Sequence, residues 1–159
     1  MELEIRPLRK RDYSRAMQFA VTGMHFDRYM SSGVMLKLYS RYFLYMELER
    51  SSQVIAAYYG DALAGVLLAD MKDEPKTHHS LWREQYVRLV DFIQNTFFRS
   101  GVGPYNAANK EMLESYSAEQ SLDGEICFLA ANPDIGVKGI GTLLLGEFER
   151  REPGKRIIL

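Results

Sequence analysis

Cysteine is almost absent from this chain, and so are long apolar runs and any excess of charge of one sign. Cys127 is the only cysteine, which excludes an intrachain disulfide and a cysteine metal cluster. No apolar run reaches the length that spans a bilayer, and the charged, alternating N-terminus is unlike a signal peptide. A formal net charge of −1 gives no argument for a nucleic-acid partner. We expect a cytoplasmic protein without a membrane or nucleic-acid partner.

The length and composition are those of one folded domain. The 159 residues are 47% hydrophobic, enough for a substantial core, so we expect a single domain over residues 1–159. Gly60-Asp61 predicts a hairpin turn between two apolar tracts. Periodicity and composition predict strands near 3–8, 53–59, 62–69, 125–131 and 155–159, and helices at 11–20, 34–49 and 142–150. The apolar stripe predicted for the second helix consists of Leu36, Tyr39, Phe43 and Met46.

The segment 72–123 is too long for a simple connection between two strands. Its first half places apolar residues at helical spacing between Trp82 and Phe97, and residues 109–120 have the character of a second helix. We therefore predict a two-helix insertion between the third and fourth strands.

The turn between the predicted strand at 125–131 and the helix that follows contains Gly136, Gly139 and Gly141. A strand, a glycine-rich turn and a helix start present several backbone N–H groups in one direction, and the helix dipole adds a positive end. Glycines permit close approach and positive φ, and Lys138 can add a point charge. The pattern predicts a phosphate site; a turn whose glycines serve only backbone geometry is the alternative.

Two familiar phosphate loops fit this turn badly. In a P-loop a Gly-Lys pair precedes Ser or Thr, whereas here Lys138 precedes Gly139 and Thr142 follows Gly141. A dinucleotide fingerprint needs a third glycine where this chain has Leu144, and it belongs to a first βα unit rather than to a late one.

A third pattern fits better. The Gly139-x-Gly141 pair follows a strand and Asn132-Pro-Asp134 and precedes Leu143-Leu-Leu145, an arrangement that resembles the acetyl-CoA signature of the GNAT N-acetyltransferases. In that family Gln or Arg stands at the first signature position, which is Gly136 here. The glycine at this position removes one side-chain contact. It does not change the backbone amides, which hold the cofactor pyrophosphate in the family.

The resemblance implies a mixed α/β fold, a GNAT-like acyl-CoA N-acyltransferase domain. Its central sheet would be mixed, with helices on both faces and the two-helix insertion between strands three and four. The resemblance covers the family pattern up to the fifth strand, at 155–159. Because the family continues with a helix, which often carries a tyrosine that protonates the leaving thiolate, and two more strands, we expect a truncated chain.

The resemblance also implies acetyl-CoA as co-substrate, without a metal. Backbone groups at the end of the fourth strand would pair with the pantetheine arm, at Leu129, Ala130 and Ala131. The cofactor phosphates would lie against the turn and the first helical residues, Val137, Lys138, Gly139, Ile140, Gly141 and Thr142. An ordinary buried strand and a surface lysine are the alternatives for the strand end and for Lys138.

Glu125 is the candidate general base. It lies fourteen positions before Gly139, the spacing of the catalytic glutamate in the histone-acetyltransferase branch of the family. Desolvation at the edge of an apolar strand can raise a carboxyl pKa toward neutral pH. A solvated glutamate at a strand start is the alternative. In this fold the loop before the second helix borders the acceptor, so His25 and Tyr29 are candidate substrate residues, with an aromatic capping loop as the alternative.

Two other residue groups carry no predicted chemistry. His78 and His79 are adjacent, so their side chains diverge and do not chelate one ion well. Cys127 lies within a strand with no histidine near in sequence, which favours packing over nucleophilic catalysis.

The sequence predicts an N-acetyltransferase in which a primary amine of a small molecule or peptide attacks acetyl-CoA directly. A non-catalytic acyl-CoA sensor is one alternative. The other is a protein-interaction module that docks a partner or a second subunit through the aromatic-rich insertion. A homodimer formed through the insertion is compatible with the enzyme.

Overall fold

Strands form where β-branched and small apolar residues run without interruption, and helices where apolar residues recur every three or four positions. The computed structural model describes residues 2–28, 32–76, 78–97 and 121–159. The strands are β1 (Leu3–Arg6), β2 (Gln53–Tyr59), β3 (Ala62–Met71), β4 (Gly124–Ala131) and β5 (Ile157–Ile158). The α-helices are α1 (Tyr13–Met24), α2 (Gly33–Arg50), α3 (Leu81–Phe97) and α5 (Ile140–Arg151), and the short 3₁₀ turns are Lys10–Asp12 and Phe26–Arg28.

The five strands form one mixed sheet in the order β1-β2-β3-β4-β5. Neighbours pair antiparallel except β4 and β5, which are parallel and meet at Gly124 and Glu125. The described residues therefore confirm a mixed α/β architecture with a five-stranded sheet and four α-helices. No helix in the described ranges is long and apolar enough to cross a membrane.

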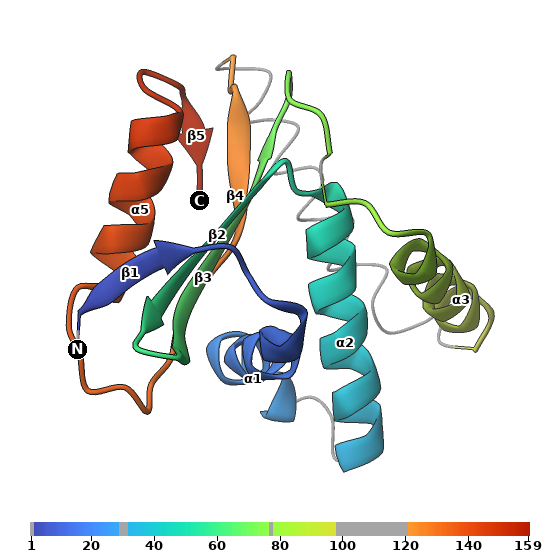
Figure 1. Cartoon of the computed structure of the whole chain (residues 1–159). Coiled ribbons are helices and arrows are strands. Elements are labelled where there is room, and N and C mark those ends of the chain that lie inside the picture. Colours follow the sequence, from blue (N-terminus) through green and yellow to red (C-terminus); the bar gives the residue numbers. More distant parts are fainter. Residues whose placement is uncertain (1, 29–31, 77, 98–120) are drawn as a thin grey trace.

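Helices cover both faces of the sheet, and each face has its own apolar core (Figure 1). On one face α1 and α2 pack against β3 and β4, with Phe19, Leu44 and Phe128 buried between them. On the other face α5 contributes Ile140, Leu144 and Phe148 to a core that also contains Leu67. Helix α3 packs on α2 rather than on the sheet. At this contact the Tyr45 and Tyr86 rings meet edge to face, with their centroids 5.4 Å apart.

The predicted elements differ from the observed ones mainly at their ends. The first strand stops at Arg6, before Pro7, because proline cannot donate to a sheet. Strand β3 continues to Met71, and α5 begins at Ile140 rather than at Thr142. The first helix of the predicted insertion is α3; the second, at 109–120, lies outside the described residues.

The apolar stripe predicted for α2 does not coincide with the buried side of the helix. Phe43 is buried, but Leu36, Tyr39 and Met46 are only partly so. The buried set is instead Ser40, Tyr42, Phe43, Leu44, Glu47 and Leu48. It is wider than a single stripe because α2 packs against the sheet on one side and α3 on another.

Candidate functional site

The predicted phosphate site, residues 137–142, is called the cradle below. It lies after the end of β4, where the chain turns into α5. Gly139 is the N-cap of α5, with φ 87° and no side-chain cap. The first bond of the helix runs from the Leu143 N–H to the Gly139 carbonyl, 2.9 Å. Within the described part of the chain, the N–H groups from Gly139 to Thr142 have no acceptor. A Cβ at Gly139 or Gly141 would meet nothing within 4 Å, so there is open space beside these two residues.

Asn132 fixes the start of this turn. Its side chain is 5% exposed, and its Nδ2 donates to the Leu63 carbonyl at 3.1 Å. Its Oδ1 accepts from the Asp134 N–H at 3.0 Å and from Arg15 at 3.2 Å. Arg15 also pairs with Asp134 at 2.5 Å. These bonds connect the turn to β3 and to α1. The Asn and Asp of the Asn-Pro-Asp motif therefore have a structural role in fixing the turn.

Gly65 on β3 allows the first turn of α5 to pack closely against the sheet. A Cβ at Gly65 would stand 2.6 Å from Ile140 Cγ2 and 3.0 Å from Leu144 Cδ1. The helix can approach β3 this closely only because the strand has no side chain there. Gly65 thus determines where the free amides of α5 lie relative to the end of β4.

The strand end predicted to hold a cofactor arm has one free edge. Leu129, Ala130 and Ala131 pair with β3 on one side. On the other side β5 reaches only Gly124 and Glu125, so no described strand covers the edge from Ile126 to Ala131. Free strand edges are sites where another extended chain can pair.

The opposite end of β4 carries a cluster of ionisable side chains, defined here as Glu47, Arg50, Asp70, Glu125 and Cys127. Glu125 is 22% exposed and pairs with Arg50. Glu47 lies on α2 with its Oε2 3.5 Å from the Arg50 Nε. The Cys127 Sγ lies 3.7 Å from the Glu125 Oε1. Asp70, opposite Glu125 in the sheet, pairs with Lys76.

A β-bulge shapes this cluster. Leu68 pairs with Phe128 and Ala69 with Ile126, so Cys127 is the extra residue of β4. A bulge places two successive side chains near the same face of a sheet and leaves the extra residue outside the ladder. Cys127 therefore lies among the charged groups at the end of α2. The sequence had favoured a packed position within the strand.

Glu47 is the acid that sequence reasoning missed. Its side chain is buried, and its Oε2 has no hydrogen-bond partner in the described residues. Burial raises its pKa to about 7, against the opposing effects of Arg50 and Cys127. Burial also raises the pKa of the Cys127 thiol. A signal was present in the sequence, because Glu47 follows Phe43 by four positions and Leu44 by three, on the apolar side of the helix.

Of the two predicted substrate residues, His25 makes no hydrogen bond or ion pair with either part of the site among the described residues. His25 ends α1 in the left-handed region, with φ 53°, and is exposed. Its neighbour Phe26 packs edge to face on Tyr39 and Phe43. Tyr29 lies outside the described residues. Phe26 is thus packed against α2, whereas His25 is exposed.

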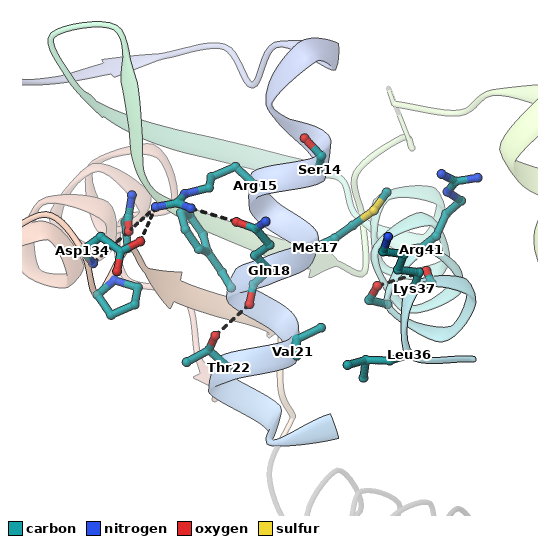
Figure 2. Close-up of a pocket in the computed structure, with 14 residues that line it drawn as sticks. Ser14, Arg15, Met17, Gln18, Val21, Thr22, Leu36, Lys37, Arg41 and Asp134 are labelled. Carbon is teal, nitrogen blue, oxygen red and sulfur yellow. Dashed lines mark hydrogen bonds and ion pairs between the residues drawn. The ribbon is translucent and has the colours of Figure 1, made fainter. Parts of the chain in front are cut away.

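A groove of about 520 Å³ lies beside the turn (Figure 2). One wall is α1, with Ser14, Met17 and Gln18, and the other is α2, with Lys37 and Arg41. The Asn132–Asp134 segment also lines it. The volume falls within the range of small-molecule sites.

Comparison with known proteins assigns no family to this chain. It matches no protein-family model, no curated protein and no solved structure. No group of three His, Cys, Asp or Glu side chains suited to a metal ion occurs among the described residues. The geometry described above is therefore what any functional assignment rests on.

Proposed function

We propose that this protein is an N-acetyltransferase that takes its acetyl group from acetyl-CoA. One observation carries the proposal: the free amides at the start of α5 lie directly beyond a strand whose outer edge is unpaired in the described chain. A helix N-terminus favours a phosphate group, and a free edge suits the amide groups of the pantetheine arm. One extended ligand could thus use both features.

The residues take the following roles in this proposal. Amides from Lys138 to Thr142 hold the pyrophosphate, and Leu129 to Ala131 pair with the arm. The Val137 N–H, which the sequence had included, instead donates to the Ile135 carbonyl at 2.8 Å. The neutral amine attacks the thioester carbonyl, so a C–N bond forms while the C–S bond breaks, and the departing CoA thiolate takes a proton from water. Glu125, at the other end of β4, takes the proton from the amine directly or through water. Glu47, which lies beside the same Arg50 side chain, is a second acid/base group.

Isothermal titration of CoA and acetyl-CoA into the purified chain tests the cradle. Gly139→Glu should abolish binding, because it places bulk and negative charge where the phosphates would lie. Gly154→Glu is the matched control, since Gly154 also has positive φ, 73°, and open space around it but lies at the other end of α5. It introduces the same charge and similar backbone strain.

Binding that survives in Gly139→Glu would remove the turn from the cofactor site. If the folded wild-type chain binds neither ligand, the acetyltransferase proposal fails. If it binds both but releases no thiol with any amine tested, the non-catalytic acyl-CoA sensor becomes the better assignment.

A second candidate function is a protein-interaction module, favoured by the outer face of α3. Leu81, Trp82, Leu89 and Phe92 are between 57% and 74% exposed. Helix α3 contacts α2 through Tyr86 and Asp91, whose hydrogen bonds reach the Leu38 carbonyl and the Tyr42 hydroxyl. Sedimentation of the wild type and of Phe92→Glu tests this candidate, including a homodimer. A monomer at all concentrations would exclude self-association through α3.

A further inference from the structure

A second groove, of about 720 Å³, is lined by α1, by α2 and by the segment that leads into α3. It shares Ser14, Met17 and Arg41 with the groove beside the turn. Its lining contains basic side chains, aromatic rings and no carboxylate. This is unexpected in a chain with 21 acidic and 20 basic residues.

The cations of this groove are poorly neutralised. Lys10 and Arg41 are exposed and have no carboxylate partner among the described residues. Arg11 is only loosely paired, 3.8 Å from Asp61 and 4.0 Å from Asp12. Exposed pairs at such distances contribute little. Three positive side chains therefore face one cavity with little compensation.

The nearby acids are committed to other partners. Asp12 accepts a hydrogen bond from the Tyr58 hydroxyl at 2.9 Å and pairs with Arg9 at 3.3 Å. Glu49 pairs with Arg83 at 2.6 Å and accepts from the Ser80 N–H at 3.1 Å. Neither is available to offset Lys10, Arg11 or Arg41.

The wall at α3 is held in place before any ligand arrives. Arg83 is only 8% exposed, and besides Glu49 it donates to the Tyr13 hydroxyl at 3.2 Å and to the His78 carbonyl. These bonds join α1, α2 and the segment that leads to Trp82. Tyr13, Tyr45 and Trp82 add flat apolar surface next to the cations. A preformed concave site with a few polar groups is the usual form of a small-molecule site.

We propose that this groove binds a small molecule that carries a phosphate group. Arg41 offers a planar fork that fits two phosphate oxygens, and Lys10 and Arg11 add point charges. The aromatic rings would contact the organic part of the molecule. Several uncompensated cations favour a multiply charged anion over a single carboxylate. The proposal is independent of acetyl transfer, because none of these residues belongs to the cradle or to the ionisable cluster.

Trp82 makes the test direct, because it is the only tryptophan of the chain and it lines the groove. Inorganic pyrophosphate and phenyl phosphate are titrated while tryptophan fluorescence is recorded. We expect a saturable change with each probe. Arg41→Gln should weaken binding about tenfold or more, the loss expected for a charge-assisted contact worth about 1.5–3 kcal/mol. Lys72→Gln, which removes an exposed charge outside the groove, should leave the affinity unchanged.

Several outcomes would overturn the proposal. One is the absence of a saturable signal with both probes, and another is an equal loss of affinity in Arg41→Gln and Lys72→Gln. Pyrophosphate could also bind at the start of α5, so the titration is repeated in Gly139→Glu. Loss of the fluorescence response in Gly139→Glu would mean that pyrophosphate binds at the cradle, and the groove would be rejected as its site. Retention, together with loss of CoA binding in the same variant, would show two separate sites.

Discussion

At the scale of single residues, Glu47 should make stability depend on pH. Its pKa is raised by burial from 4.5 to about 7 in the folded chain. Between these values the folded state binds more protons than the unfolded state, so this group favours folding at low pH. Its contribution is lost as pH rises through about 7. The full effect is on the order of 3 kcal/mol.

Glu47→Gln is therefore expected to stabilise the protein at pH 8 by about 1–3 kcal/mol, because a neutral amide has no ionisation cost. At pH 5 the gain should shrink toward zero, since the native carboxyl is then protonated. Urea unfolding of both proteins at the two pH values measures the difference. Glu149→Gln, at an exposed position of α5, is the control and should show no such trend. A gain of the same size at both pH values would refute the assignment.

Glu125 should affect catalysis rather than cofactor affinity if it accepts the amine proton. In Glu125→Gln we expect kcat to fall about a hundredfold to ten-thousandfold, the usual contribution of a general base, with little change in acetyl-CoA binding. The pH–rate profile should lose its acidic limb. Because Glu125 also pairs with Arg50, the unfolding free energy of the variant must be measured alongside. An unchanged pH–rate profile would exclude Glu125 from this role.

At the scale of elements, the turn between β4 and α5 depends on Asn132. Asn132→Ala removes the bond to the Leu63 carbonyl and both bonds accepted by Oδ1. Leaving these buried groups unpaired should cost about 1–3 kcal/mol of unfolding free energy. CoA affinity should fall as well, because the amides of α5 lose their fixed position. The two readouts are urea unfolding and calorimetric titration.

Asn95→Ala is the matched control for that change, because Asn95 is exposed on α3 and alanine favours helices. It should leave both stability and CoA binding close to those of the wild type. Loss of stability in Asn132→Ala with unchanged CoA affinity would mean that the turn is structural only.

Elements with continuous local patterns could be predicted from the sequence. Strand β2 was predicted at its observed bounds, and the Gly60-Asp61 turn joins it to β3 as expected. The register of β4 could not be predicted, because the bulge at Cys127 depends on how Leu68 and Ala69 pair across the sheet. For the same reason Gly65 had no predicted role: its effect on α5 arises from residues some 75 positions away, at Ile140.

At the scale of the whole molecule, the candidate sites are of two kinds. The cradle is local in sequence, since one strand, one turn and one helix build it, and it was predicted from consecutive residues. The ionisable cluster combines Glu47 from α2, Asp70 from β3 and Glu125 from β4. The second groove combines Lys10 from the first 3₁₀ turn, Arg41 from α2 and Arg83 from α3. Sites of this second kind require the tertiary fold before they can be recognised.

Because α5 packs on β2 and β3, a ligand at its N-terminus should stabilise the entire fold rather than one helix. A ligand that binds only the folded state at 100 times its Kd adds about 2.7 kcal/mol. For a domain of this size that corresponds to a rise in Tm of roughly 5–11 °C. We expect this shift with CoA in the wild type and in Gly154→Glu, and none in Gly139→Glu, by thermal unfolding followed with circular dichroism. A shift that persists in Gly139→Glu would place CoA elsewhere. A separate early transition that alone moves with CoA would mean that α5 unfolds independently of the sheet.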